Sequence, residues 1–255
     1  MARHRAVKFD DRLTLVEHLD ELRTRLIVVI AALLVASGLC FWQNDLLLDI
    51  ANKPLPGDLV PITFGVTEPF MTTLTLSIYG GLLLAMPVVL YQAYAYVLPA
   101  FSPVERRVVL PFLLAVPFLF IAGVVFAYFV VIPAATQFLL NFNAAEFNIE
   151  VRAREYYSFF ALTSIAIGVL FQIPIGVLAV TRLGITTPEQ LARNRKYAIL
   201  VIAIVAMLLP GTDPVTMLIS MLPLVLLFEL SLLLARAFGR PPDEAAAARA
   251  AEEPG

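Results

Sequence analysis

The chain has 255 residues, of which 60% are hydrophobic and 15% are charged, whereas soluble globular proteins have roughly 45–50% and 25%. So few polar residues cannot cover a water-soluble surface, and we therefore expect an all-α protein that crosses a membrane several times. The formal net charge of −2 argues against nucleic acid as the main partner. The single cysteine, Cys40, excludes an intrachain disulfide and a cysteine-based metal cluster.

Six hydrophobic runs are candidates for spanning helices, which need roughly 20 apolar residues. The runs cover about residues 26–42, 70–97, 108–132, 156–180, 197–209 and 215–235. The longest connections, 43–69 and 133–155, carry enough apolar residues to form ordered caps. We expect one membrane domain over residues 1–238, followed by a low-complexity, disordered tail over 239–255.

The basic residues predict the orientation of the chain. Fifteen of the eighteen Lys and Arg lie at the two ends of the sequence, in the second-to-third connection or in the fourth-to-fifth connection. The other three are Lys53, Arg152 and Arg154. Because positive charge marks the cytoplasmic side, we expect both termini inside the cell and the two long loops outside.

The fifth run, 197–209, is short, and a turn over 210–214 follows it. Thirteen helical residues span about 20 Å, less than the roughly 30 Å hydrocarbon core. The short fifth and sixth spans either thin the bilayer locally or belong to a tilted helix. Prolines inside the runs invite kinks and predict a curved bundle with a concave side, although ordinary membrane-protein proline usage is an alternative. These prolines are Pro87, Pro117, Pro174 and Pro223.

Four leucines form one helical stripe ahead of the first run, and they predict an amphipathic helix on the cytoplasmic interface that bends into the membrane. They are Leu15, Leu19, Leu22 and Leu26. Glu21 in this segment either pairs with Arg25, four residues on, or receives a cationic partner. Thr14 and Glu17 fit a capping box.

Three further polar residues are candidates for function. Ser102, Pro103 and Glu105 predict a helix start, so Glu105 either only closes the cap or stands ready for a cation. Gln172 lies in a run without charged residues, and we expect it to find an interhelical partner. Glu229, about 9 Å from the end of the last run, either faces inward or lies near the cytoplasmic interface.

Catalytic motifs are missing from the sequence. It contains no H-E-x-x-H, no G-x-S-x-G and no P-loop. Its two histidines, His4 and His18, both precede the first hydrophobic run. We therefore expect neither an enzyme nor a bound cofactor.

Residues 18–26 resemble the H-L-x-E-L-R-x-R-L signature of the TatC family, the receptor subunits of the twin-arginine protein translocase. The resemblance covers roughly residues 13–236, and its other short motifs follow in the family's order. They lie at residues 90–92, 99–101, 105–107, 126–129, 171–174, 183–186 and 210–213. Six spans with both termini inside also match this family.

The resemblance implies a function. The family binds the Ser/Thr-Arg-Arg signal of folded preproteins at the cytoplasmic face of the bacterial inner membrane and exports them with the proton motive force. Glu21 and Glu105 match its acidic binding positions, and Arg23 matches a functional position beside one of them. Arginine never deprotonates and presents a planar fork, so a carboxylate is its natural partner.

The resemblance also implies roles for Pro54 in the first outside loop and Asp213 in the last outside turn. Gln172 departs from the family, because well-studied members often have Glu there, which weakens the case for a proton-binding role. The implied partners are single-span TatA and TatB subunits, with self-association in the receptor complex.

Two other interpretations stay open. A small-solute or ion secondary transporter would use Gln172 and Glu229 as midplane ligands, although the sequence offers few buried ligands. An inert scaffold for other membrane subunits would need neither residue. Binding of a twin-arginine peptide separates all three interpretations.

Overall fold

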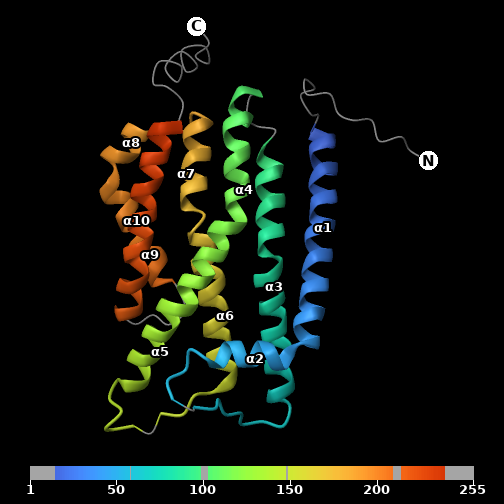
Figure 1. Ribbon diagram of the computed structural model, residues 1–255, viewed down its shortest axis with the longest axis vertical. Helices are drawn as coiled ribbons and strands as arrows, with labels where there is room; N and C mark the ends of the chain where they lie inside the picture. Colours follow the sequence, from blue (N-terminus) through green and yellow to red (C-terminus); the bar gives the residue numbers. More distant parts are fainter. Residues whose placement is uncertain (1–14, 58, 99–102, 148, 209–213, 239–255) are drawn as a thin grey trace, which may run out of the picture.

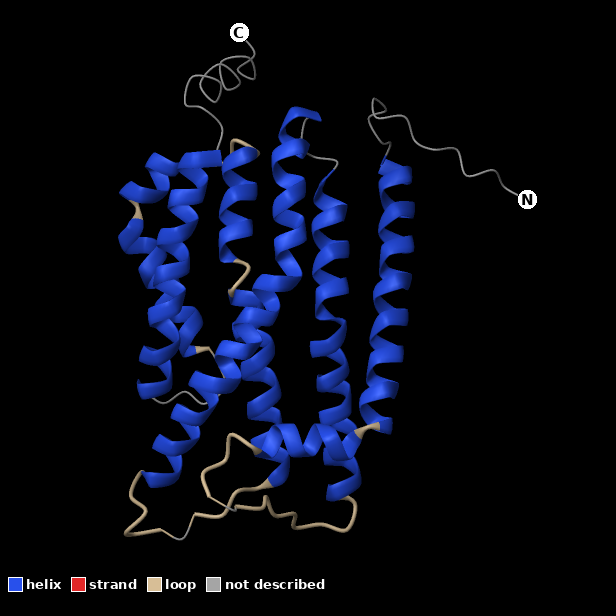
Figure 2. Cartoon of the chain, viewed as in Figure 1, coloured by secondary structure: helices blue, strands red, loops and turns tan. Residues whose placement is uncertain are grey.

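The computed structural model describes residues 15–57, 59–98, 103–147, 149–208 and 214–238. These residues form ten α-helices and a π-helix, and no strand beyond an isolated bridge between Ile62 and Arg152 (Figure 2). The elements are α1 (Leu15–Trp42), α2 (Asn44–Asn52), α3 (Glu68–Val97), α4 (Pro103–Phe126), η2 (Ala127–Val131), α5 (Ile132–Asn141), α6 (Ala153–Leu170), α7 (Ile173–Arg182), α8 (Pro188–Arg193), α9 (Arg195–Met207) and α10 (Pro214–Phe238). The all-α prediction is confirmed for this part of the chain.

Five helical stretches among the described residues are long and apolar enough to cross a membrane. They are His18–Trp42, Glu68–Val97, Leu114–Asn141, Ala153–Arg182 and Pro214–Ala237. The expected fifth run corresponds to α9, whose 13 residues give about 20 Å of helix. The expectation of a short element is therefore met, whereas the count of six spans is not established.

The long helices stand side by side, with α4 and α6 in the middle of the bundle (Figure 1). Helix α1 packs mainly on α3 at one edge, and α10 packs on α7 and α9 at the other. Helices α1 and α4 begin at the same end, called the α1/α4 end below. Helix α2 lies across the opposite end, the α2 end, where α3 and α6 begin.

Helix α1 corrects the expectation of an interfacial helix that bends into the membrane. It runs without interruption from Leu15 to Trp42, and it contains no proline. Its leucine stripe therefore continues directly into the apolar run, and Leu19, Leu22 and Leu26 are all exposed. The predicted capping residue Thr14 lies outside the described residues.

The third span also differs from its expected bounds, because helix continues past Ile132 to Asn141. The wider turn of the π-helix η2 precedes α5, so Pro133 falls at the second position of a new helix. A proline is tolerated there because the first N–H groups of a helix have no intrahelical partner. The second of the two long connections, expected over 133–155, thus begins after Asn141 rather than at Pro133.

The fourth span is broken rather than merely kinked. Helix α6 ends at Leu170, and α7 begins at Ile173 with Pro174 in its first turn. The carbonyl of Gln172 accepts hydrogen bonds from the N–H groups of Ile175 and Gly176 at 3.0 Å, which starts the new helix. Pro87 and Pro223 instead lie inside continuous helices α3 and α10.

The first long connection, 43–69, is expected to form an ordered cap over the bundle, and it contains helix α2. The carbonyls at the carboxyl-terminal end of α2 accept hydrogen bonds from elsewhere in the chain. The hydroxyl of Tyr156 donates to Ala51 O at 2.6 Å, and that of Tyr128 donates to Ile50 O at 3.1 Å. Helix ends leave such carbonyls without intrahelical partners, and Ala51 is fully buried. The tyrosine hydroxyls therefore fix α2 across the end of the bundle.

The two long connections are joined beside α2. Ile62 donates its N–H to Val151 O at 2.8 Å and accepts from the N–H of Ala153 at 2.9 Å. Arg152 donates from Nε to Glu68 Oε1 at 2.8 Å, and the second oxygen of Glu68 accepts the N–H of Phe64 at 2.8 Å. One carboxylate thus ties the start of α3 to both connections.

Replacing Tyr156 with Phe tests the role of the hydroxyl. The change leaves the buried Ala51 carbonyl without its donor, which costs about 1–3 kcal/mol, so the apparent Tm in detergent should fall. Tyr197→Phe is the matched control, because Tyr197 is exposed. Equal Tm values for the two variants would show that the α2 carbonyl does not depend on Tyr156.

Candidate functional site

Two of the predicted acidic residues belong to helices that begin at the same end of the bundle. Glu21 lies in the second turn of α1, and Glu105 is the third residue of α4. Both helices start at the α1/α4 end (Figure 1). The start of α4 at Pro103 agrees with the predicted helix start, while the side chain of Glu105 lies outside the described part.

Glu21 is held in a network that reaches α3. Its Oε1 accepts hydrogen bonds from two guanidinium nitrogens of Arg25, Nε at 3.0 Å and Nη2 at 2.6 Å. The other terminal nitrogen of Arg25 donates to Gln92 Oε1 on α3 at 2.9 Å. The expected pairing of Glu21 with Arg25 is therefore confirmed, and it is part of a contact between helices.

The second oxygen of Glu21 faces a weaker neighbour. Glu21 Oε2 lies 3.9 Å from Nδ1 of His18, whose ring stacks on Tyr96 of α3 with centroids 4.3 Å apart. The Glu21 side chain keeps 26% of its surface exposed. Since a carboxylate has about four acceptor sites and Arg25 uses one oxygen, Glu21 retains capacity for a further donor.

Arg23 lies on a different side of α1 from Glu21, because two residues turn a helix by about 200°. It is exposed and makes no hydrogen bond or ion pair with the described residues. The structure therefore does not bring Arg23 into the Glu21 network.

Gln172 has the interhelical partner that its buried amide predicts. It is 5% exposed, and its Nε2 donates to the carbonyl of Val116 on α4 at 3.2 Å. Helices α4 and α6 approach closely just beyond this contact, because a Cβ on Gly123 would lie 2.8 Å from Gly168 Cα. The amide oxygen of Gln172 is buried without a hydrogen-bond partner in the described part.

Glu229 pairs with the first residue of α9. Its Oε2 accepts from a terminal nitrogen of Arg195 at 2.9 Å, and the two side chains are 39% and 48% exposed. This exposure favours the interfacial interpretation over an inward-facing acid. Gln172 and Glu229 thus contact different helices, α4 and α9, which gives a shared midplane ligand site no support.

The remaining candidates belong to the loops. The carbonyl of Pro54 accepts a hydrogen bond from Thr136 of α5 at 3.3 Å, so Pro54 is part of the structure around α2. It lies at the end opposite to the start of α1 (Figure 1). Asp213 lies outside the described residues. Within those residues, no group of three His, Cys, Asp or Glu side chains could hold a metal ion.

Sequence reasoning missed the partners that α3 supplies. Gln92 anchors Arg25 and Tyr96 supports His18, yet they lie 67 and 78 residues away from these partners along the chain. Gln92 and Tyr96 are four residues apart and so share a helical face, and Gln92 lies in the family motif at residues 90–92, but neither signal indicates a contact with α1. Hydrophobic periodicity indicates which face of a helix is buried, but it does not indicate which helix packs against that face.

Comparisons with known proteins identify the family of this chain. A family model described as Sec-independent protein translocase protein (TatC) matches residues 17–223. TatC proteins of Carboxydothermus hydrogenoformans and Escherichia coli K12 are 36% and 34% identical to this chain, covering 89% of it in both cases and 94% and 90% of the relatives.

Solved structures show the same fold. A crystal structure of the twin-arginine translocase receptor TatC in DDM superposes with a TM-score of 0.75 at 35% identity, covering 88% of this chain and all of that one. A second crystal structure of the receptor gives a TM-score of 0.73. On this evidence, the chain belongs to the TatC family of protein translocase components and is a helical protein of the bacterial inner membrane.

Proposed function

We propose that this chain is the receptor subunit that binds the Arg-Arg motif of signal peptides on folded preproteins. Glu21 and Glu105 bind the two guanidinium groups on the cytoplasmic side. The observation that supports this most directly is the Glu21 carboxylate, whose Oε1 is bonded by Arg25, which is itself anchored to Gln92. In the described part of the chain, the only ion pair of its Oε2 is the 3.9 Å contact with His18. The common starting end of α1 and α4 also supports it.

The chemistry of the carboxylates explains a preference for arginine. A guanidinium keeps its charge at all physiological pH values and offers donors in a planar fork, whereas lysine presents a compact ammonium. Each charge-assisted hydrogen bond to a partly shielded carboxylate contributes roughly 1.5–3 kcal/mol. Two such carboxylates, each bound to one of two adjacent arginines, would therefore discriminate Arg-Arg from Lys-Lys.

Glu21 suits this role because Arg25, its ion-pair partner on α1, is also hydrogen-bonded to α3. Arg25 divides its donors between Glu21 Oε1 and Gln92, so the carboxylate is oriented while its Oε2 keeps acceptor sites for a further donor. An incoming guanidinium would bond to Oε2, and His18 would lie beside it. Arg23, exposed on a different side of α1 from Glu21, contacts the signal peptide away from the twin arginines.

The proposed topology has six spans with both termini in the cytoplasm. Helix α9 is then the short fifth span, and the distribution of fifteen of the eighteen basic residues supports the orientation. The apolar part of the signal peptide lies against the concave wall of the bundle, and thinning of the bilayer near α9 eases its entry.

Transport itself requires partners. Helices this apolar, with few charges between their ends, do not line a wide aqueous path for a folded protein. Single-span TatA and TatB type subunits therefore dock on the bundle, several receptor copies associate, and the proton motive force drives export. The Gln172 amide has no titratable proton, so the coupling step in this chain does not protonate that side chain.

Removing the charge of either acid should weaken signal binding. Glu21→Gln and Glu105→Gln should each lower the affinity of the purified protein for a twin-arginine peptide by about tenfold, the equivalent of roughly one charge-assisted hydrogen bond. Fluorescence anisotropy of a labelled peptide measures the affinity, with its Lys-Lys analogue as the reference ligand.

Asp20→Asn is the matched control, because Asp20 is exposed and adjacent to Glu21 but turned about 100° around α1. It should bind the peptide as the unmodified protein does. Unchanged affinity in both the Glu21 and Glu105 variants would contradict the proposed site.

Reconstitution tests the need for partners. Liposomes that contain this chain alone should not export a folded twin-arginine substrate under a proton gradient, because the bundle lacks an aqueous path. Addition of TatA and TatB type subunits should restore protease-protected substrate. Export by the chain alone would refute the proposed need for partner subunits.

A further inference from the structure

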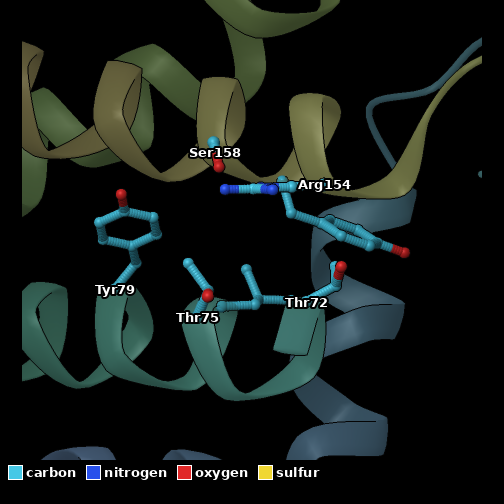
Figure 3. Close-up of a pocket in the computed structure, with 7 residues that line it drawn as sticks. Thr72, Thr75, Tyr79, Arg154 and Ser158 are labelled. Atoms are coloured by element: carbon cyan, nitrogen blue, oxygen red, sulfur yellow. The ribbon is translucent and has the colours of Figure 1, made fainter. Parts of the chain in front are cut away.

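A small pocket lies between α3 and α6 at the α2 end, where both helices begin (Figure 3). It is a shallow pocket open to solvent, and its interior has room for about one water-sized atom. Its lining residues are Thr72, Thr75, Leu76 and Tyr79 of α3 and Arg154, Tyr157 and Ser158 of α6. Hydroxyl groups of α3 thus face a guanidinium and a serine of α6 across the pocket.

Two polar groups of this pocket are unmatched within the described part of the chain. Thr72 is 6% exposed, and its Oγ1 is buried without a hydrogen-bond partner. Arg154 is exposed and makes no hydrogen bond or ion pair with the described residues. A buried hydroxyl without a partner carries a desolvation penalty, which a ligand in the pocket would relieve.

The nearby carboxylates do not neutralise Arg154. Glu68 binds Arg152 at 2.8 Å, and Glu155 binds the same guanidinium at 3.4 Å. Arg152 thus carries both ion pairs, and Arg154 makes no ion pair within the described part of the chain.

The donors around the pocket select an anion with several oxygens. Arg154 offers a charged fork, and Thr72, Thr75 and Ser158 offer hydroxyl protons. The first turns of α3 and α6 add the positive ends of two helix dipoles. A phosphate group fits this set best, because it accepts from a guanidinium and hydroxyls together.

The place of the pocket in the fold indicates where that phosphate comes from. Glu68 and Ala153 are the first residues of two membrane-spanning stretches, so the pocket lies at the boundary between water and hydrocarbon. Farther along the same helices, the exposed side chains of Ile78 and Leu162 lie one turn beyond Thr75 and Ser158. Acyl chains can cover these residues while a headgroup reaches the pocket.

We propose that this pocket binds the phosphate of an anionic phospholipid headgroup, with Arg154 as the charged donor and Thr72 as the buried one. The pocket has room for one oxygen of the phosphate, so the rest of the phosphate lies at its mouth beside Arg154, and the glycerol and the acyl chains lie on the outer surface of α3 and α6. The site is independent of signal-peptide binding, because it lies at the end opposite to Glu21.

Titration of the full chain in neutral detergent with dioleoylphosphatidylglycerol, followed by native mass spectrometry, tests the proposal. Arg154→Gln should weaken binding of the first lipid by about fivefold, as expected for a partly exposed charge pair, and Thr72→Val should weaken it in the same direction. Arg193→Gln removes the same charge from an exposed site on α8 and should leave lipid affinity unchanged.

Two further arms identify the ligand. A diacylglycerol without phosphate should not compete for the site, and inorganic phosphate should compete only weakly because it lacks the acyl contacts. Equal affinity of the unmodified chain and both pocket variants would overturn the site. Competition by inorganic phosphate as strong as that by the lipid would overturn the lipid as its source. The Tm of each variant confirms that it is folded. Weaker lipid binding by either folded pocket variant supports the site.

Discussion

A chain inside a membrane has no water to pair with its backbone, so every N–H or C=O freed by a helix break must find a partner within the protein. This constraint explains the irregular parts of the bundle. Before Pro133 the chain forms a π-helix, so the proline falls where no N–H is needed. Before Pro174 the chain ends one helix and starts another on the carbonyl of Gln172.

The same constraint explains the tyrosines at the α2 end. Helix α2 is short and lies across the bundle, and Ala51 near its end is buried away from bulk water. Tyr128 and Tyr156 supply donors from η2 and α6. Their rings also pack with Phe160 in the apolar cluster beneath α2. Aromatic residues with a polar tip suit this boundary because one part of the side chain is apolar and the other bonds to the backbone.

Charge is sorted to the two ends of the molecule. The Glu21, Arg25 and Gln92 network lies near the α1/α4 end, and the Glu68, Arg152 and Glu155 cluster lies at the α2 end. The break in the fourth span carries a neutral amide, Gln172, between them. In the described part of the chain these ion pairs therefore lie towards the two ends of the bundle, whereas Gln172 offers hydrogen bonds without charge between them.

Sequence alone determined the class of protein and its local rules. Hydrophobic runs and proline positions predicted a helical membrane protein, a short element at 197–209 and a kink near Pro174, where the structure has a break, and the ordered motifs indicated the TatC family. Helix bounds around Pro133, the straight course of α1, and the partners Gln92, Tyr96 and Val116 came only from the tertiary structure. The physical reason is that periodicity and capping act within about one helical turn, whereas these contacts join residues more than fifty positions apart and depend on how the helices pack.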